Sequence, residues 1–197
     1  MNSDVATIAA FLSAIGDRTP YPGGGAAAAY AVAMGASLTC MVGRFSIVGA
    51  DPVELVARSE HIAVLALELL GKDADSYAEV LGVDASRITM EPAAYREARR
   101  RALHQASLVP AEVTRLGAEV VKMALALTDV ANRYLIGDAI TAGLIAQGGA
   151  LSAFGLVCEN LAGTQDPLLE AAIGWSEEIE EAGVALRALL ASRHASP

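Results

Sequence analysis

The sequence predicts an all-α protein, and its composition, residue periodicity and glycine and proline punctuation support that class. Hydrophobic residues make up 54% of the 197 residues and aromatic residues only 5%, so alanine, leucine and valine carry the apolar character. This composition favours helices over strands. Apolar residues recur at helical spacing, and we find no strand pattern. We predict a single domain over residues 1–197, folded as an up-and-down bundle of about six helices.

The first two predicted helices are joined by a glycine-rich turn. Ser3 can cap a first, amphipathic outer helix that runs to about residue 15, and Gly16 can end it. The turn at 19–25 reads Thr-Pro-Tyr-Pro-Gly-Gly-Gly, and its glycines permit backbone angles closed to other residues. An alanine-rich helix then runs to about residue 45. Small residues at four-residue spacing let such a helix pack closely, so we expect it at the centre of the molecule.

Two or three helices are predicted in the middle of the chain. Asp51 is a capping residue and precedes a proline, so a helix starts there and continues to about residue 83, a length of about 45 Å. A helix is next predicted at 93–108. Pro110 either kinks it or starts another helix, which covers 111–130.

The last two predicted helices differ in polarity. The helix at 139–161 is apolar and opens next to Asp138, whose default role is capping. The helix from 167 to about 192 is rich in glutamate, amphipathic and solvent-facing. The uncharged runs at 19–43 and 139–158 are long enough to cross a membrane, but they are built from alanine and glycine and lack flanking basic clusters. We interpret them as buried central helices of an oligomer, not as membrane spans.

Composition and spacing exclude several classes of function. The net charge of −9 and the presence of only two lysines argue against a nucleic-acid partner. Cys40 and Cys158 lack CxxC spacing and are expected to be reduced, and the start of the chain lacks a basic signal-peptide flank, so the cytoplasm is the expected location. His61, His104 and His194 have no metal-ligand spacing. We therefore predict no metal site.

The residues alone indicate three candidate functional features, and each also has a purely structural explanation. Glycines 23–25 can expose the first N–H groups of a helix to an anionic or carbonyl ligand, or form a tight packing corner. Asp73 and Asp75 follow an apolar run and either supply a general acid/base or face solvent. The arginines within 96–101 either attract an anionic ligand such as a carboxylate tail or form a solvated face. We also predict no tightly bound cofactor.

Four segments resemble, in the right order, the motifs of the cyclodeaminase/cyclohydrolase family. These segments are Pro22-Gly23-Gly24-Gly25-Ala26 with Met41-Val42-Gly43, Asp73-Ala74-Asp75-Ser76-Tyr77 with Val109-Pro110, 132–139, and Asn160-Leu161. That family comprises the C-terminal domain of formiminotransferase-cyclodeaminase and the stand-alone methenyltetrahydrofolate cyclohydrolases. The resemblance implies an all-α subunit that dimerises through long helices, with a folate site near the glycine turn.

The resemblance also assigns roles to individual residues. It implies that Asp73 and Asp138 are catalytic, and that the substrate contacts Pro22, Gly23, Gly24, Gly25, Tyr77, Asn132 and Asn160. The chain departs from the family pattern at three places. Gly137 stands where the family carries serine, Leu156 where it carries asparagine, and residues 45–52 contain no lysine.

The implied reaction is hydrolysis of 5,10-methenyltetrahydrofolate to 10-formyltetrahydrofolate. A carboxylate can activate water to attack the amidinium carbon between N5 and N10 and, once protonated, assist ring opening. Cyclodeamination of 5-formiminotetrahydrofolate is the second possibility within the family. Two other readings stay open: a relative acting on a non-folate amidine, imine or cyclic substrate, and a non-catalytic helical dimer.

Overall fold

Six helices make up the described part of the chain. The computed structural model describes residues 3–19, 21–46 and 52–194, and of these the side chains of 3–6, 52, 73–77 and 194 lie outside the description. The helices are α1 (Ser3–Ile15), α2 (Gly24–Phe45), α3 (Pro52–Ala85), α4 (Pro92–Val130), α5 (Ile136–Asn160) and α6 (Pro167–His194). No strand occurs within those described ranges. The predicted all-α class and the number of helices are confirmed.

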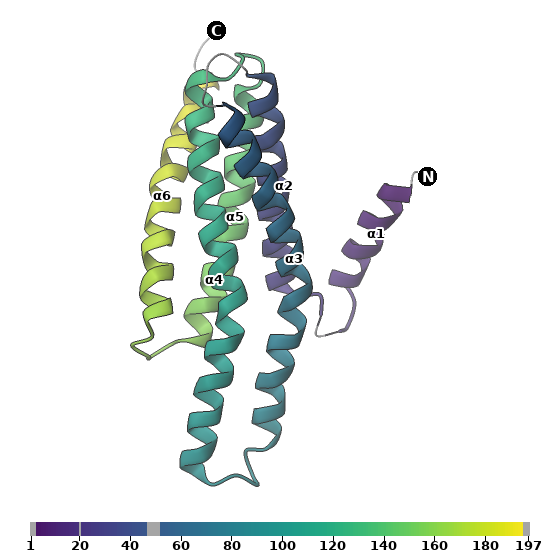
Figure 1. The fold of residues 1–197 in the computed structure, drawn as a ribbon, viewed down its shortest axis with the longest axis vertical. Coiled ribbons are helices and arrows are strands. Elements are labelled where there is room, and N and C mark those ends of the chain that lie inside the picture. The colour runs from purple at the N-terminus through teal and green to yellow at the C-terminus, as the bar shows by residue number, and fades with distance from the viewer. Residues whose placement is uncertain (1–2, 20, 47–51, 195–197) are drawn as a thin grey trace.

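The central helices α2 and α5 run antiparallel and touch closely, as Figure 1 shows. A Cβ atom added to Gly149 would come within 2.7 Å of the Ala28 carbonyl oxygen, and one added to Gly35 within 2.8 Å of the Ala142 carbonyl oxygen. Glycine is therefore required at both points of contact. These contacts confirm that the alanine-rich helix lies in the core.

The same two helices are long and apolar enough to cross a membrane by length and composition. In α2, 56% of the most hydrophobic window is buried inside the bundle, and in α5 50%. Core helices of soluble proteins often have the same length and apolar composition. Burial against α3, α4 and α6 accounts for their apolar character here.

Helix α4 corrects the prediction of a break at Pro110, because a single helix of 39 residues continues through that proline. Pro110 and Ala111 are both buried, and the Thr114 hydroxyl donates to the Pro110 carbonyl at 2.9 Å. Burial of the helix face on both sides of Pro110 outweighs the backbone hydrogen bond that proline removes.

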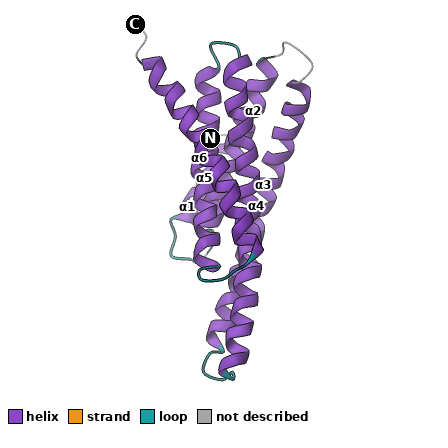
Figure 2. Cartoon of the chain, turned by 90° about the vertical axis from the view of Figure 1, so that its left-hand side faces the viewer, coloured by secondary structure: helices purple, strands orange, loops and turns teal. Residues whose placement is uncertain are grey.

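Helices α3 and α4 extend together beyond the other helices (Figures 1 and 2). We call this projection, residues 78–103, the α3–α4 arm. At its tip Glu91 caps α4, because its carboxylate accepts from the Ala93 and Ala94 amides at 2.8 and 3.0 Å. Asp51, the predicted cap of α3, lies outside the described residues.

Helix α1 stands beside the bundle in Figure 1 and ends at Ile15 as predicted, but it already includes Ser3, the predicted cap. Phe11 packs against Tyr30 of α2, with ring centroids 5.2 Å apart. Ile8 and Leu12 are about half exposed, so part of the apolar face of this outer helix is uncovered in the single chain.

Candidate functional site

The glycine turn is attached to α3 at a defined point. The Tyr21 hydroxyl donates to the Leu70 carbonyl oxygen at 2.6 Å, one helical turn before Asp73. Pro22 follows Tyr21 in a cis peptide bond, and Gly23 is the N-cap of α2. The turn therefore lies against the segment of α3 that contains Asp73.

Gly24 of the turn borders open space, and Gly23 does not use the backbone angles, closed to other residues, that glycine permits. Gly23 is extended, with φ −126° and ψ −152°, and among the described residues a positive φ is found at Gly163. A Cβ atom added to Gly24 would meet nothing within 4 Å. None of the side chains that the structure describes caps α2, and its first turn contains no acidic residue. The leading N–H groups of α2 are thus free to bind a ligand.

Asn160, at the end of α5, lies at the level of this turn. Gly149 of α5 touches Ala28 of α2, and α5 runs in the opposite direction to α2. Extending that register by eleven residues along α5 brings Asn160 to the residues that precede Gly24. The C-terminal end of α5 and the N-terminal end of α2 therefore lie at the same end of the bundle.

The packing of α3 and α5 against α4 shows that the backbone of Asp73 and Tyr77 lies at the same level as Asn160. Arg58 pairs with Glu119, and Tyr95 bonds to Asp84, which fixes the antiparallel register of α3 and α4. That register sets residue 73 opposite 104–106. The contacts of Thr114 and Gly117 with Ala150 likewise set Asn160 opposite 104–107. The backbone of 73–77 thus lies at the level of Asn160 and the turn, while the side chains of Asp73 and Tyr77 are outside the described residues.

Asn132 and Asp138 lie at the opposite end of the bundle, beside the α4–α5 loop (Figure 1). Asp138 precedes Asn160 by 22 residues of continuous helix, a distance of about 33 Å. Asn132 is exposed and accepts a hydrogen bond from the Tyr134 amide at 3.1 Å. A single chain therefore brings together the turn, residues 73–77 and Asn160, and it leaves Asn132 and Asp138 apart.

The predicted capping role of Asp138 is also corrected. Helix α5 begins at Ile136 with Leu135 as its N-cap, so Asp138 lies in the first turn. Leu135 and Ile136 pack against the core, which starts the helix earlier than its polar residues indicated. The carboxylate of Asp138 still interacts favourably with the helix dipole.

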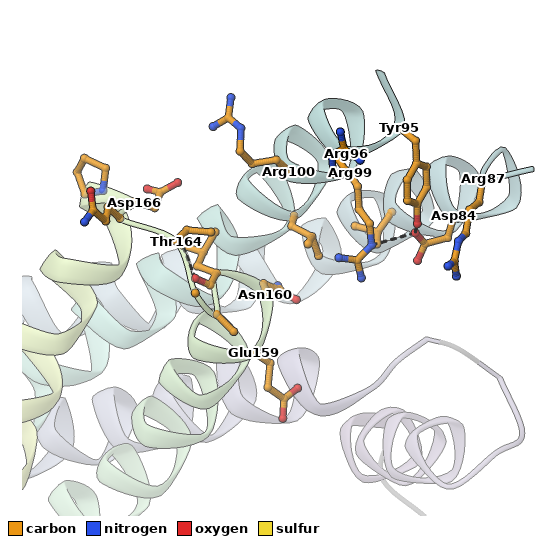
Figure 3. Close-up of a pocket in the computed structure, with 17 residues that line it drawn as sticks. Asp84, Arg87, Tyr95, Arg96, Arg99, Arg100, Glu159, Asn160, Thr164 and Asp166 are labelled. Carbon is orange, nitrogen blue, oxygen red and sulfur yellow. Dashed lines mark hydrogen bonds and ion pairs between the residues drawn. The ribbon is translucent and has the colours of Figure 1, made fainter. Parts of the chain in front are cut away.

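A large cavity opens beside Asn160, between the α3–α4 arm and the α5–α6 loop (Figure 3). Its volume is about 1220 Å³. Four arginines line it: Arg87, Arg96, Arg99 and Arg100. The spacing of the last three on α4 was visible in the sequence. Arg87, Tyr95 and Asp84 were missed, because only the pairing of α3 with α4 brings them to the same wall.

Two carboxylates in this cavity are held ionised by partners of their own. Asp84 accepts from the Tyr95 hydroxyl at 2.7 Å and from Arg99 at 3.1 Å, and these bonds lower its pKa. Partial burial works to raise the pKa of Asp166, but the Leu168 amide and His104 outweigh it and hold that pKa below its usual value. The His104 Nδ1 atom lies 2.7 Å from Asp166.

Neither cysteine offers a reactive thiolate. Cys40 and Cys158 are free, as predicted, and burial raises the pKa of both thiols. Among the residues that the structure describes, no three His, Cys, Asp or Glu side chains are grouped so that they could hold a metal ion. The available chemistry is therefore that of carboxylates, backbone amides and arginines.

Fold and sequence together define this protein as an all-helical member of a known family. The sequence model of the formiminotransferase-cyclodeaminase family matches residues 7–177, and the chain belongs to that family. It is 33% identical over 169 residues to the methenyltetrahydrofolate cyclohydrolase of Methylorubrum extorquens, with 81% of each chain covered. Its fold is similar to the crystal structure of formiminotetrahydrofolate cyclodeaminase from Thermotoga maritima. The TM-score is 0.79 at 21% identity, covering 92% of this chain and 94% of that one.

Proposed function

We propose that this chain is a folate-dependent one-carbon enzyme that hydrolyses 5,10-methenyltetrahydrofolate to 10-formyltetrahydrofolate. The observation that carries the proposal is the convergence of the uncapped start of α2, the Asp73 segment of α3 and Asn160 at one end of the bundle. The likeness to a cyclohydrolase over 81% of the chain supports the choice of substrate.

In the proposed mechanism Asp73 acts first as a base and then as an acid. Water adds to the amidinium carbon and gives a proton to the Asp73 carboxylate. The protonated carboxyl group then gives this proton to N5 as the bond between N5 and that carbon breaks. The remaining hydroxyl proton goes to solvent, and the formyl group stays on N10.

The other residues of this end position the substrate in the proposal. The free N–H groups behind Pro22, Gly23, Gly24 and Gly25 bind an oxygen or a negative charge of the folate. Tyr77 and Asn160 contact its ring system. No tightly bound cofactor takes part in this scheme, and tetrahydrofolate enters as the substrate.

We further propose a cytoplasmic homodimer paired through α2 and α3. Met34 of α2 and Leu67 of α3 are 42% and 51% exposed and line a shallow apolar hollow with Leu38 and Met41. An exposed apolar face of this kind is typical of a subunit interface. Because one chain separates Asp138 and Asn132 from the glycine turn, these two residues act in the site only if a second subunit supplies them.

The test of the proposed reaction is the loss of methenyl absorbance after protein is added to 5,10-methenyltetrahydrofolate. We expect a rate above the uncatalysed hydrolysis that is proportional to protein concentration. No acceleration at micromolar protein would contradict the assignment. Release of ammonia from 5-formiminotetrahydrofolate, measured in parallel, tells the hydrolase from the cyclodeaminase.

A second candidate function is the same fold acting on a non-folate amidine or imine. Leu156 favours it, because the register of α2 and α5 sets this apolar residue close to Gly23 and Gly24, where the family carries asparagine. A thermal-shift series with folates and small cyclic amidines separates the two. Stabilisation by an amidine and not by any folate would favour this alternative.

A further inference from the structure

We propose that the cavity between the α3–α4 arm and the α5–α6 loop binds the glutamate tail of the substrate, with Arg87 and Arg96 contacting its carboxylates. This inference rests on the proposed folate reaction and assigns a tail-binding role to residues of this cavity. Figure 3 shows the arginines of the arm along one side of the cavity and the end of α5 along the other.

The position of the cavity fits a ligand that begins at the glycine turn. Asn160 lines the cavity and also lies at the level of that turn. The α3 side of the cavity wall is formed by Val80 and Asp84, with Arg87 just beyond the end of the helix. Asp84 is eleven residues beyond Asp73, about 16 Å along the helix. That distance is comparable to the length of a folate from its pteridine ring to its glutamate.

The charges in the cavity leave two arginines available. Arg99 pairs with Asp84 at 3.1 Å, and Arg100 pairs with Glu97 at 2.8 Å. Arg87 and Arg96 form no ion pair or hydrogen bond through their side chains within the described part of the chain.

The carboxylates of the cavity have hydrogen-bond partners other than these two arginines, although the charge of Arg87 also acts on Asp84 and helps to lower its pKa. Asp84 is occupied by Tyr95 and Arg99, and Asp166 is occupied by His104 and the Leu168 amide. The Glu159 side chain points away from the arginines in Figure 3. In a chain of net charge −9, this wall therefore presents two guanidinium groups that form no hydrogen bond or ion pair among the described residues. Their planar forks suit carboxylates, which they bind through paired hydrogen bonds.

The experiment compares the double variant Arg87→Gln/Arg96→Gln with Arg101→Gln. Arg101 lies on the same helix, is exposed and does not line the cavity. The substrates are 5,10-methenyltetrahydrofolate with one or three glutamates and the corresponding tetrahydropteroate, which has none. Both surface variants should keep the circular dichroism and melting temperature of the parent.

The expected result is a change in KM that depends on the tail. For the glutamate-bearing substrates the double variant should raise KM about three- to tenfold, as expected for partly exposed ion pairs, with kcat unchanged. KM for the tetrahydropteroate should stay constant, and Arg101→Gln should behave as the parent. An equal KM for all three substrates, unaffected by the double variant, overturns the tail site and leaves the proposed reaction standing.

A binding measurement separates failure of the site from failure of the reaction. Calorimetry with p-aminobenzoyl-triglutamate, which has the tail and no pteridine, measures binding to the cavity independently of catalysis. If the parent protein does not hydrolyse methenyl folates but binds this fragment and the double variant does not, the reaction is wrong and the tail site holds. If the parent does not bind the fragment, and KM is the same for substrates with and without glutamates, the proposed tail site is wrong.

Discussion

The two ends of α5 carry polar motifs of similar appearance but in different surroundings. At the Asn160 end, the uncapped start of α2, the Asp73 segment and a cavity of about 1220 Å³ come together. At the Asp138 end, polar groups are satisfied locally: Asn132 accepts from the amide of Tyr134, and Arg133 lies 4.6 Å over the Tyr134 ring. Polar residues at a helix end therefore mark a site only where several elements leave groups free.

The most damaging change at the Asn160 end should be Asp73→Asn. Removing the acid/base should lower kcat about a thousandfold, within the range measured for general acid–base groups, without changing the fold. Loss of methenyl absorbance measures the rate. Asp75→Asn is the matched control, because residues two apart on a helix do not share a face. Activity of Asp73→Asn within a few-fold of the parent would remove this residue from the mechanism.

The Asp138 end is tested next by complementation. If a second subunit brings Asp138 to the glycine turn, Asp138→Asn should lower kcat about ten- to a hundredfold, a typical contribution of a charged site residue. Mixing Asp138→Asn with Asp73→Asn should then restore activity, because mixed dimers contain one intact site. Subunit exchange is confirmed by mass spectrometry.

The opposite result would sharpen the contrast between the two ends. An Asp138→Asn protein as active as the parent would confine the site to the Asn160 end and leave Asp138 a helix-dipole residue. Loss of activity without recovery in proven mixed dimers would instead indicate that Asp138 acts through the stability of α5 in its own chain.

Much of the fold could be predicted because helix signals are local. Helix α1 ends at the predicted residue, and α2 and α6 end within two residues of their predicted ends. The predicted break at Pro110 was wrong. The free-energy cost of a proline in a helix is local, whereas the burial that compensates for it comes from residues distant in sequence. The predicted capping role of Asp138 was wrong for a similar reason, because packing of Leu135 and Ile136 in the core sets the start of α5.

The candidate site could be predicted only in part, for a related reason. The motifs predicted the glycine turn, Asp73 and Asn160 as site residues, but their order could not tell which motifs lie at the same end of the bundle. That depends on the lengths and registers of α3, α4 and α5, as the separation of Asp138 from Asn160 shows. The cavity was not foreseen because its walls, near Asp84 and Asn160, are far apart in sequence.

The register that separates the two ends can be tested at two adjacent glycines of α5. Gly149→Ala should destabilise the protein by about 1–3 kcal/mol, because the new Cβ atom would lie 2.7 Å from the Ala28 carbonyl oxygen. Gly148→Ala meets nothing within 4 Å and should stabilise the helix by about 0.5–1 kcal/mol. Urea unfolding measures both. Equal effects of the two changes would mean that α2 and α5 pack in another register.

A smaller effect than that of Gly149→Ala is expected at Asp166, which holds the start of α6 beside the cavity. Its carboxylate accepts from the Leu168 amide at 2.9 Å, so Asp166→Ala should cost about 1 kcal/mol through loss of the helix cap. Asp166→Asn keeps a capping side chain and removes only the charge, so it isolates the electrostatic part. Urea unfolding as a function of pH measures each contribution.

The pH dependence of that contribution has a definite sign. The pKa of Asp166 is lower in the folded protein than its ordinary value of 3.8, so the charged form favours folding. The stability difference between parent and Asp166→Asn should be fully present above pH 3.8 and disappear as the pH falls through the folded pKa. A stability difference that persists at lower pH would assign the effect to hydrogen-bond geometry. The charge of Asp166 would then not contribute to the stability of the Asn160 end.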